Sequence, residues 1–303
     1  MPTAKVGEIN IEYYVEGSGP PLLMIMGWIG NAGFWGEAFL EPLRSRFQVI
    51  RLSNRGTGLS DKPPGEVTIR TMAGDAAGLL RELGIERAHV LGISMGGMIA
   101  QELVLNCPRA VQGLVLGCTM CGFAHGVSPE TDEIRGPSPA TMTPNERVRQ
   151  LLTAAATPEF LSKADSQFWQ WLATTWFAAP TPWETIGKHF LAVQSFDTYD
   201  RLPQIKAPTL IVHGDRDLML PVGNAEILRE RIPDSRVRIV PDVAHMFFWE
   251  KPAESAGAIS EFLKSAVPGR VGAETREGSS GPTGRAARMG RSSSSRDFSL
   301  RAE

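Results

Sequence analysis

Short apolar runs alternate with amphipathic stretches along most of the chain, and this alternation restricts the fold more than any other feature. Apolar residues recur at helical spacing within residues 70–83, 95–106, 222–231 and 252–265. Continuous apolar runs, typical of buried strands, occur at 21–26, 47–52, 88–93, 111–117, 208–214 and 236–240. The run 9–15 alternates with period two and predicts a half-exposed antiparallel edge strand. The pattern predicts an α/β protein with a mainly parallel sheet and helices on both faces.

The alternation stops between residues 122 and 200, where no strand-like run occurs. This segment has helical patterns at 144–156, 158–175 and 182–196, and it contains four of the seven tryptophans, Trp169, Trp171, Trp176 and Trp183. We interpret it as a helical cap inserted into a core of residues 1–121 and 201–267. Apolar residues at helical spacing more often pack than bind ligands. An aromatic-rich cap nevertheless commonly roofs an apolar pocket, and we expect Trp169 and Trp176 to contribute to its wall.

Residues 268–303 have a different composition, with seven Ser, six Gly, seven Arg and one aromatic residue, Phe298. Such a segment cannot bury enough apolar surface to offset the entropy lost on ordering. We therefore predict a disordered tail. Seven Arg against four acidic residues give this tail a charge of +3, so a basic docking segment is the alternative interpretation.

Composition narrows the range of partners. The 303 residues contain 31 Lys and Arg against 33 Asp and Glu, without the clustered positive charge that nucleic-acid binding requires. No stretch approaches the roughly 18 apolar residues of a membrane span, and charged residues interrupt the N-terminal segment where a signal peptide needs an apolar run. We expect a cytoplasmic protein with no nucleic-acid partner and no membrane span. Nothing in the sequence indicates an oligomeric state.

The cysteines do not predict a metal site or a disulfide framework. There are three, Cys107, Cys118 and Cys121, and the last two form a lone C-x-x-C. No second cysteine pair or histidine pair stands at the spacing of zinc ligands. We expect buried free thiols and neither a metal nor an organic cofactor.

The most informative string is HVLGISMGGMIAQEL, residues 89–103. It places a G-x-S-x-G motif, Gly92 to Gly96, between a strand pattern and a helix pattern, which is the context of a nucleophile elbow. Gly92 and Gly96 are the small residues that allow the backbone to reverse sharply around Ser94. Such a turn exposes the serine hydroxyl near a helix N-terminus, whose dipole favours developing negative charge. The alternative is a glycine-rich turn with an N-capping serine.

A serine nucleophile needs a general base, and His245 is the candidate. It follows the strand pattern 236–240 and precedes a helix that begins near Pro252. This places it at the carboxyl end of a strand, where chemistry collects in open α/β sheets. His89 and His213 lie within buried strand patterns, and we expect them to be hydrogen-bonded core residues.

The third catalytic residue must be a carboxylate that orients the imidazole. Asp215 and Asp217 both follow the strand 208–214. We favour Asp217, because it stands three residues beyond Gly214 and four before Pro221, whereas Asp215 suits an Asx-type turn. The chain order Ser, Asp, His is that of α/β-hydrolases.

The chain resembles the α/β-hydrolase superfamily from about residue 5 to residue 267. Beyond the elbow, SNRGTGLSDKP (53–63) is similar to the family's Asp-x-Arg-Gly-x-Gly-x-Ser segment, GDRDLMLP (214–221) to its acid loop and VAHMFFWEKP (243–252) to its histidine loop. The resemblance implies an α/β-hydrolase fold in which Ser94, Asp217 and His245 form the catalytic triad.

Two strings depart from the family pattern. Many relatives have His-Gly in the first oxyanion loop, whereas this chain has Met26-Gly27-Trp28, similar to the Met-Gly version of esterases like the aclacinomycin methylesterases. The backbone amides of Trp28 and Met95 would then hold the oxyanion, and we expect Met26 and Trp35 in the pocket wall. Ser53 stands where relatives usually have Asp, which leaves open how its loop is bonded.

These features predict a serine hydrolase that cleaves esters of small or hydrophobic substrates through an acyl-enzyme intermediate. A serine nucleophile disfavours haloalkane dehalogenase and epoxide hydrolase chemistry, which uses Asp. Lactone, enol-lactone or thioester cleavage, cofactor-free perhydrolysis and carbon–carbon bond hydrolysis are alternatives on the same triad. A ligand-binding receptor or scaffold with this fold is the non-enzymatic alternative.

Overall fold

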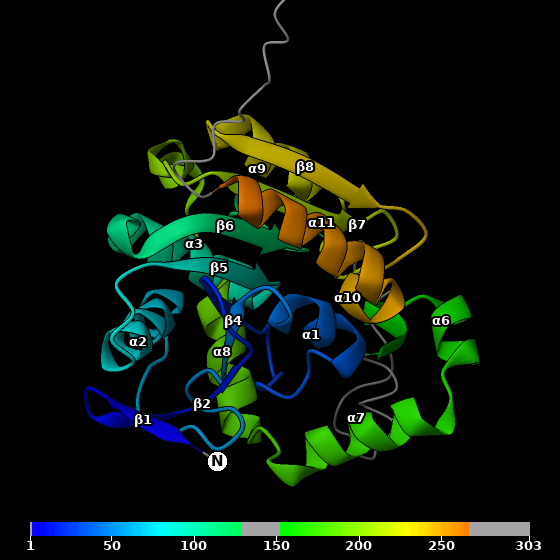
Figure 1. Ribbon diagram of the computed structural model, residues 1–303, viewed down its shortest axis with the longest axis horizontal. Helices are drawn as coiled ribbons and strands as arrows, with labels where there is room; N and C mark the ends of the chain where they lie inside the picture. Colours follow the sequence, from blue (N-terminus) through cyan, green and yellow to red (C-terminus); the bar gives the residue numbers. More distant parts are fainter. Residues whose placement is uncertain (1, 129–151, 267–303) are drawn as a thin grey trace, which may run out of the picture. The chain divides into compact units, whose positions relative to one another are not determined.

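A single mixed sheet organises the computed structural model, which describes residues 2–128 and 152–266 (Figure 1). Within these residues the strand order is β1-β2-β4-β3-β5-β6-β7-β8. Strands β3 to β8 run parallel, whereas β2 pairs antiparallel with both β1 and β4. The strands are β1 (Thr3–Val6), β2 (Ile9–Glu16), β3 (Pro21–Ile25), β4 (Gln48–Leu52), β5 (Ala88–Ile93), β6 (Val111–Gly117), β7 (Thr209–Gly214) and β8 (Ser235–Val240). The predicted α/β class with a mainly parallel sheet is confirmed.

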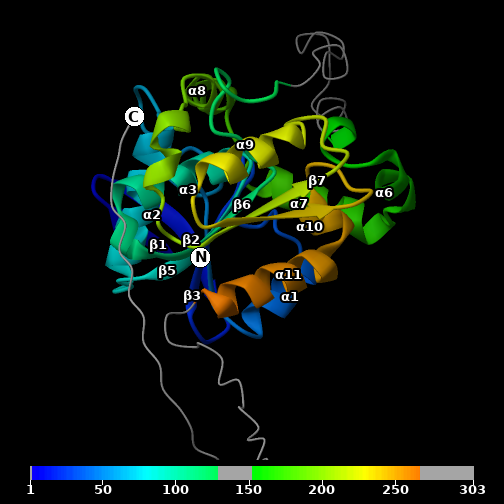
Figure 2. The ribbon, with the colours of Figure 1, turned by 90° about the horizontal axis from the view of Figure 1, so that it is seen from above.

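Helices cover both faces of the sheet. Figure 2 shows α1 and α11 on one face and α2, α3 and α9 on the other. The helices of the described residues are α1 (Glu37–Arg44), α2 (Ile69–Glu82), α3 (Met95–Asn106), α6 (Pro158–Lys163), α7 (Ser166–Ala178), α8 (Trp183–Gln194), α9 (Gly223–Arg231), α10 (Phe247–Glu250) and α11 (Pro252–Ser265). Each face buries its own apolar cluster, with Leu23, Ile99 and Leu103 in one and Met24, Phe248 and Ile259 in the other.

Local signals explain where several helices begin. The Thr68 hydroxyl accepts a hydrogen bond from the Thr71 N–H and caps α2. Pro252 occupies the first turn of α11, where its missing N–H costs nothing. The predicted helices 95–106 and 252–265 coincide with α3 and α11.

Three sequence predictions need correction. The run 9–15 is antiparallel but is not the edge, because β1 pairs along its outer side. The run 236–240 was expected to be buried, yet most of β8 is exposed or half-buried, since β8 is the opposite edge. The predicted helix 158–175 is two helices, because the Asp165 side chain accepts a hydrogen bond from the Phe168 N–H at 2.8 Å and starts α7 afresh.

The cap and tail predictions fall partly outside the described residues. Of the segment 122–200, the structure describes residues 122–128 and 152–200, which contain α6, α7 and α8. The division into core and cap stays a prediction. The segment 268–303 lies wholly outside the described residues. Among the helices that are described, none has the length and apolar character needed to cross a bilayer.

Candidate active site

Ser94 lies at the junction of β5 and α3. Its backbone has φ 57° and ψ −123°, a conformation that strains any residue with a side chain. A Cβ atom on Gly92 would lie 2.1 Å from the Gly96 oxygen, and one on Gly96 would lie 2.1 Å from the Ile25 oxygen. Only glycine therefore fits at both positions, and the strand can pass directly into the helix with Ser94 at the turn.

Asp217 and His245 are hydrogen-bonded and buried. The Nδ1 atom of His245 lies 2.7 Å from Oδ2 of Asp217, and the two residues are 2% and 5% exposed. The other carboxylate oxygen accepts hydrogen bonds from the backbone N–H groups of Met219 and Leu220, each at 2.9 Å. Burial alone would raise the pKa of Asp217, but the neighbouring histidines outweigh it and hold that pKa well below its usual value. Asp215 is exposed, so Asp217 is the carboxylate that contacts the imidazole.

A second histidine approaches the same carboxylate. His213 is fully buried on β7, and its Nε2 lies 3.3 Å from Oδ2 of Asp217 and 2.7 Å from the Leu220 oxygen. The sequence predicted a hydrogen-bonded core histidine there but did not reveal that Asp217 is a neighbour. The spacing of four residues from His213 to Asp217 is the signal that was available.

His89 differs from its prediction. It is fully buried in β5, but neither ring nitrogen has a hydrogen-bond partner among the described residues. Burial lowers the pKa of His89 to about 4, with a smaller contribution from Arg87. The imidazole is therefore neutral at physiological pH and acts as an apolar side chain against Phe47.

The loop after β3 brings its backbone against the serine. A Cβ atom on Gly27 would lie 3.0 Å from the Cβ of Ser94 and 3.1 Å from the Ile93 oxygen, so a larger residue here would be tightly packed against the serine. Trp28 and Met95 line the same cavity as Ser94. The assignment of their backbone N–H groups as oxyanion donors stays a prediction. It requires both residues to lie beside Ser94 in the cavity, as they do.

Ser53 has a carboxylate partner from a distant strand. Its hydroxyl donates to Oε2 of Glu12 at 2.7 Å and accepts from the Ala32 N–H at 3.0 Å. The same Glu12 oxygen accepts the Leu59 N–H at 2.9 Å. Glu12 thus supplies, from β2, a carboxylate that bonds the loop at the position where relatives usually have Asp.

Ser94 and His245 line one cavity of about 240 Å³. No Asp, Glu, Lys or Arg is among the described residues that line it. Both indole N–H groups in the wall are already bonded, that of Trp28 to the Ile186 oxygen and that of Trp249 to the Phe34 oxygen. Half of the described residues that line the cavity are methionines, phenylalanines or tryptophans, namely Met26, Met95, Met98, Met219, Met246, Trp28, Phe34, Phe123, Phe190 and Trp249.

Two of the predicted wall residues lie elsewhere. Trp35 is fully buried in the core, stacked on Phe39 with ring centres 5.9 Å apart. Trp169 is 37% exposed, and its indole N–H donates to the Ala164 oxygen. Neither lines the cavity, because Trp35 packs among the core aromatic residues and Trp169 lies at the surface. The side chain of Trp176 lies outside the described residues.

Cys118, Asp217 and His245 form the one group of potential metal ligands found among the described residues. The Asp217 and His245 atoms closest to each other already share a hydrogen bond. Burial raises the pKa of the Cys118 thiol well above its usual value, and the charge of Asp217 raises it further. Cys118 and Cys121 are buried free thiols, as predicted, whereas Cys107 is partly exposed.

Comparison with known proteins gives a consistent family. A family model described as alpha/beta hydrolase fold matches residues 20–252. A putative carbamate hydrolase, RutD, from Azorhizobium caulinodans is 31% identical over 260 residues, which cover 82% of this chain and 92% of that protein.

Two solved structures of hydrolytic enzymes are also similar to this chain. A thermophilic esterase from Thermogutta terrifontis is similar with a TM-score of 0.73 and 27% identity, covering 87% of this chain and 96% of that one. Est816, described as an N-acyl homoserine lactone degrading enzyme, is similar with a TM-score of 0.71 and 28% identity, covering 86% of this chain and all of the other.

Proposed function

The chain belongs to the α/β-hydrolase fold family, and from this premise we propose that it is a serine hydrolase of neutral, apolar carboxylic esters. One observation carries the proposal. A serine at a strained elbow and a histidine bonded to a buried carboxylate line one cavity whose other described side chains are apolar. A nucleophile, its base and the base's orienting group are the parts that acyl transfer needs.

The proposed ester hydrolysis uses Ser94, His245 and Asp217 in the following steps. His245 accepts the Ser94 proton as the hydroxyl oxygen attacks the ester carbonyl, and Asp217 stabilises the imidazolium that forms. The backbone N–H groups of Trp28 and Met95 stabilise the oxyanion. His245 then protonates the leaving alcohol. A water molecule activated by the same imidazole cleaves the acyl-enzyme and restores Ser94.

The cavity wall supports a preference for uncharged substrates. A carboxylate on the substrate would lose its hydration among methionine and aromatic side chains, without a cationic partner among the described residues. A volume of about 240 Å³ is smaller than the roughly 300–1,000 Å³ of drug-sized pockets. We therefore propose short to medium acyl groups. We also propose that the oxyanion loop Met26-Gly27-Trp28 acts like the Met-Gly loop of the aclacinomycin methylesterase-like esterases, which it resembles in sequence.

A substrate pair of similar size tests the preference. We expect p-nitrophenyl butyrate to be cleaved with a kcat/KM at least about tenfold above that of the mono-p-nitrophenyl ester of succinic acid, since an unpaired buried charge costs more than about 1.4 kcal/mol. A fluorophosphonate should label the wild type, whereas the Ser94→Ala variant should stay unlabelled. Absence of both turnover and labelling would rule out the serine hydrolase and favour a ligand-binding role.

Lactones are the second candidate class. The similarity to Est816 and the apolar wall both favour a neutral lactone that carries an apolar acyl group. Ring opening uses the same triad and oxyanion donors as ester cleavage. Measuring kcat/KM for an N-acyl homoserine lactone beside p-nitrophenyl butyrate would rank the two classes.

A further inference from the structure

The backbone on both sides of His245 is hydrogen-bonded, on one side to a side chain six residues along the chain and on the other to a distant segment. The N–H of Ala244, directly before the histidine, donates to Oε1 of Glu250 at 2.9 Å. The N–H of Met246, directly after it, donates to the Ala155 oxygen at 2.8 Å. The imidazole is therefore carried by a peptide segment that is fixed at both ends.

Glu250 also reaches the segment that precedes α6. Its second carboxylate oxygen accepts a hydrogen bond from the Thr157 N–H at 3.2 Å and another from the Thr157 hydroxyl. Thr157 is 4% exposed and caps α6. A single carboxylate thus connects the histidine loop to residues 155–157, of which Ala155 lines the cavity.

The surroundings of Glu250 distinguish this contact from a surface ion pair. Burial raises the pKa of Glu250, while the hydrogen bonds from Thr157 and Ala244 act in the opposite direction. All three donors point to carboxylate oxygens, and no Lys or Arg of the described residues forms a salt bridge with Glu250. The role of this carboxylate is therefore to bind backbone and hydroxyl groups.

We propose that Glu250 is a positioning residue for the general base. It holds the Ala244–Met246 segment against residues 155–157, so that the His245 imidazole keeps its hydrogen bond to Asp217 in the wall of the cavity that Ser94 also lines. This inference rests on the proposed function, in which His245 is the base. It assigns to Glu250 a role in orienting the base, without contact with the substrate. A displacement of about 1 Å in a catalytic group is enough to cost up to about 100-fold in rate.

Variants of Glu250 and Thr157 separate the effect of the Ala244 bond from that of the Thr157 bonds. Glu250→Ala removes the three hydrogen bonds that Glu250 accepts and keeps the backbone bond from Met246 to Ala155. It should lower kcat by about 10- to 100-fold, with KM within about twofold of the wild type, because Glu250 itself does not line the cavity. Glu250→Gln keeps an acceptor for Ala244 but presents an amide N–H to Thr157, so its kcat should be intermediate. Thr157→Val should lower kcat, and Thr157→Ser should restore it.

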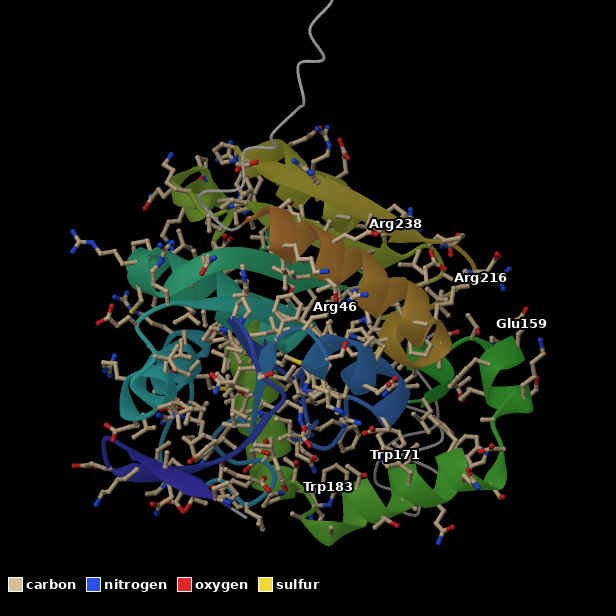
Figure 3. The ribbon with its side chains drawn as sticks, viewed as in Figure 1. Arg46, Glu159, Trp171, Trp183, Arg216 and Arg238 are labelled. Atoms are coloured by element: carbon tan, nitrogen blue, oxygen red, sulfur yellow. The ribbon has the colours of Figure 1, made fainter. Side chains whose placement is uncertain are left out.

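Glu159→Gln is the matched control. Glu159 lies on α6 close to Thr157 in sequence, but its exposed side chain pairs with Arg216 at the outer edge of the molecule (Figure 3). The substitution removes the same charge, whose effect on the pKa of Glu250 is small beside that of burial, and should leave kcat and KM within about twofold of the wild type. Thermal unfolding of every variant, measured alongside, identifies any that fail to fold.

A measurement independent of turnover completes the test. The Nδ1 proton that His245 shares with Asp217 should give a downfield NMR resonance, which should weaken through faster exchange in Glu250→Ala and persist in Glu159→Gln. Unchanged kcat and an unchanged resonance in folded Glu250→Ala would overturn the positioning role. Equal kcat losses in Glu250→Ala and Glu159→Gln would do the same. If the wild type cleaves no ester, the proposed function fails, but the resonance still tests the contact.

Discussion

The indole Nε1–H of Trp28 donates a hydrogen bond to the backbone oxygen of Ile186 on α8, 3.0 Å away. Two neighbouring contacts reinforce it, from the Thr181 hydroxyl to the Ile29 oxygen at 3.1 Å and from the Asn31 side-chain amide to the Thr175 oxygen at 3.2 Å. The loop proposed to stabilise the oxyanion is therefore fixed by residues more than 140 positions away in sequence.

Removing the indole N–H should slow the reaction without removing the oxyanion donor. Trp28→Phe keeps the backbone amide and a ring beside Phe190, but it loses one neutral hydrogen bond worth about 1 kcal/mol. We expect kcat/KM for p-nitrophenyl butyrate to fall by about fivefold. Trp169→Phe loses a similar indole bond at an exposed site and should keep the wild-type value. Equal losses in both variants would show that the Trp28 contact has no special role.

The two acidic candidates after β7 should differ sharply. Asp217→Asn leaves the shape of the side chain but cannot stabilise the imidazolium, so kcat should fall by about 10⁴-fold. Asp215→Asn should stay within about twofold of the wild type, because Asp215 is exposed and Asp217 occupies the place beside His245. Steady-state kinetics of both purified variants decide the matter, and a larger loss at Asp215 would contradict our assignment.

The strained backbone of Ser94 should be visible in stability. Alanine keeps the cost of a side chain at φ 57°, whereas glycine relieves it. We expect Ser94→Gly to unfold with a free energy about 1 kcal/mol higher than Ser94→Ala, although glycine usually destabilises relative to alanine. Urea denaturation of the two inactive variants measures the difference. The opposite order would mean that the elbow is not strained.

Stability at acidic pH should depend on His89. Its folded-state pKa is lowered to about 4 by burial, whereas the unfolded chain takes up the proton near pH 6.5. The folded state therefore loses stability as the pH falls from about 6.5 to about 4. His89→Leu removes this loss. The free energy of unfolding of the wild type should therefore fall by on the order of 2 kcal/mol more than that of His89→Leu when the pH is lowered from 7.5 to 5.

A non-titrating neighbour provides the control for His89. The ring of Phe47 meets His89 edge-on with centres 6.0 Å apart. Phe47→Leu should change the free energy of unfolding by a similar amount at both pH values, since it removes only packing. If His89→Leu also behaved in this way, the buried histidine would not be the source of the pH dependence.

Features that depend on neighbours along the chain could be predicted from the amino-acid sequence. Strand and helix periodicity predicted the α/β class and the limits of α3 and α11, because burial of one face imposes a local repeat. The elbow around Ser94 could be predicted for the same reason. Gly92 and Gly96 lie within five residues of each other, and each avoids a steric clash that a side chain would cause at the turn. Asp217 could be preferred over Asp215 from its place in a short loop.

Contacts between residues far apart in the sequence could not be predicted in this way and are known from the folded structure. Trp35 is an aromatic residue of the type that often lines an apolar pocket, but it is buried in the core. Trp249 lines the cavity instead. The carboxylate that Ser53 needs comes from Glu12, 41 positions earlier, and Thr157 meets Glu250 across 93 positions. No local repeat encodes such contacts, because they depend on how the sheet order brings the loops together at one edge.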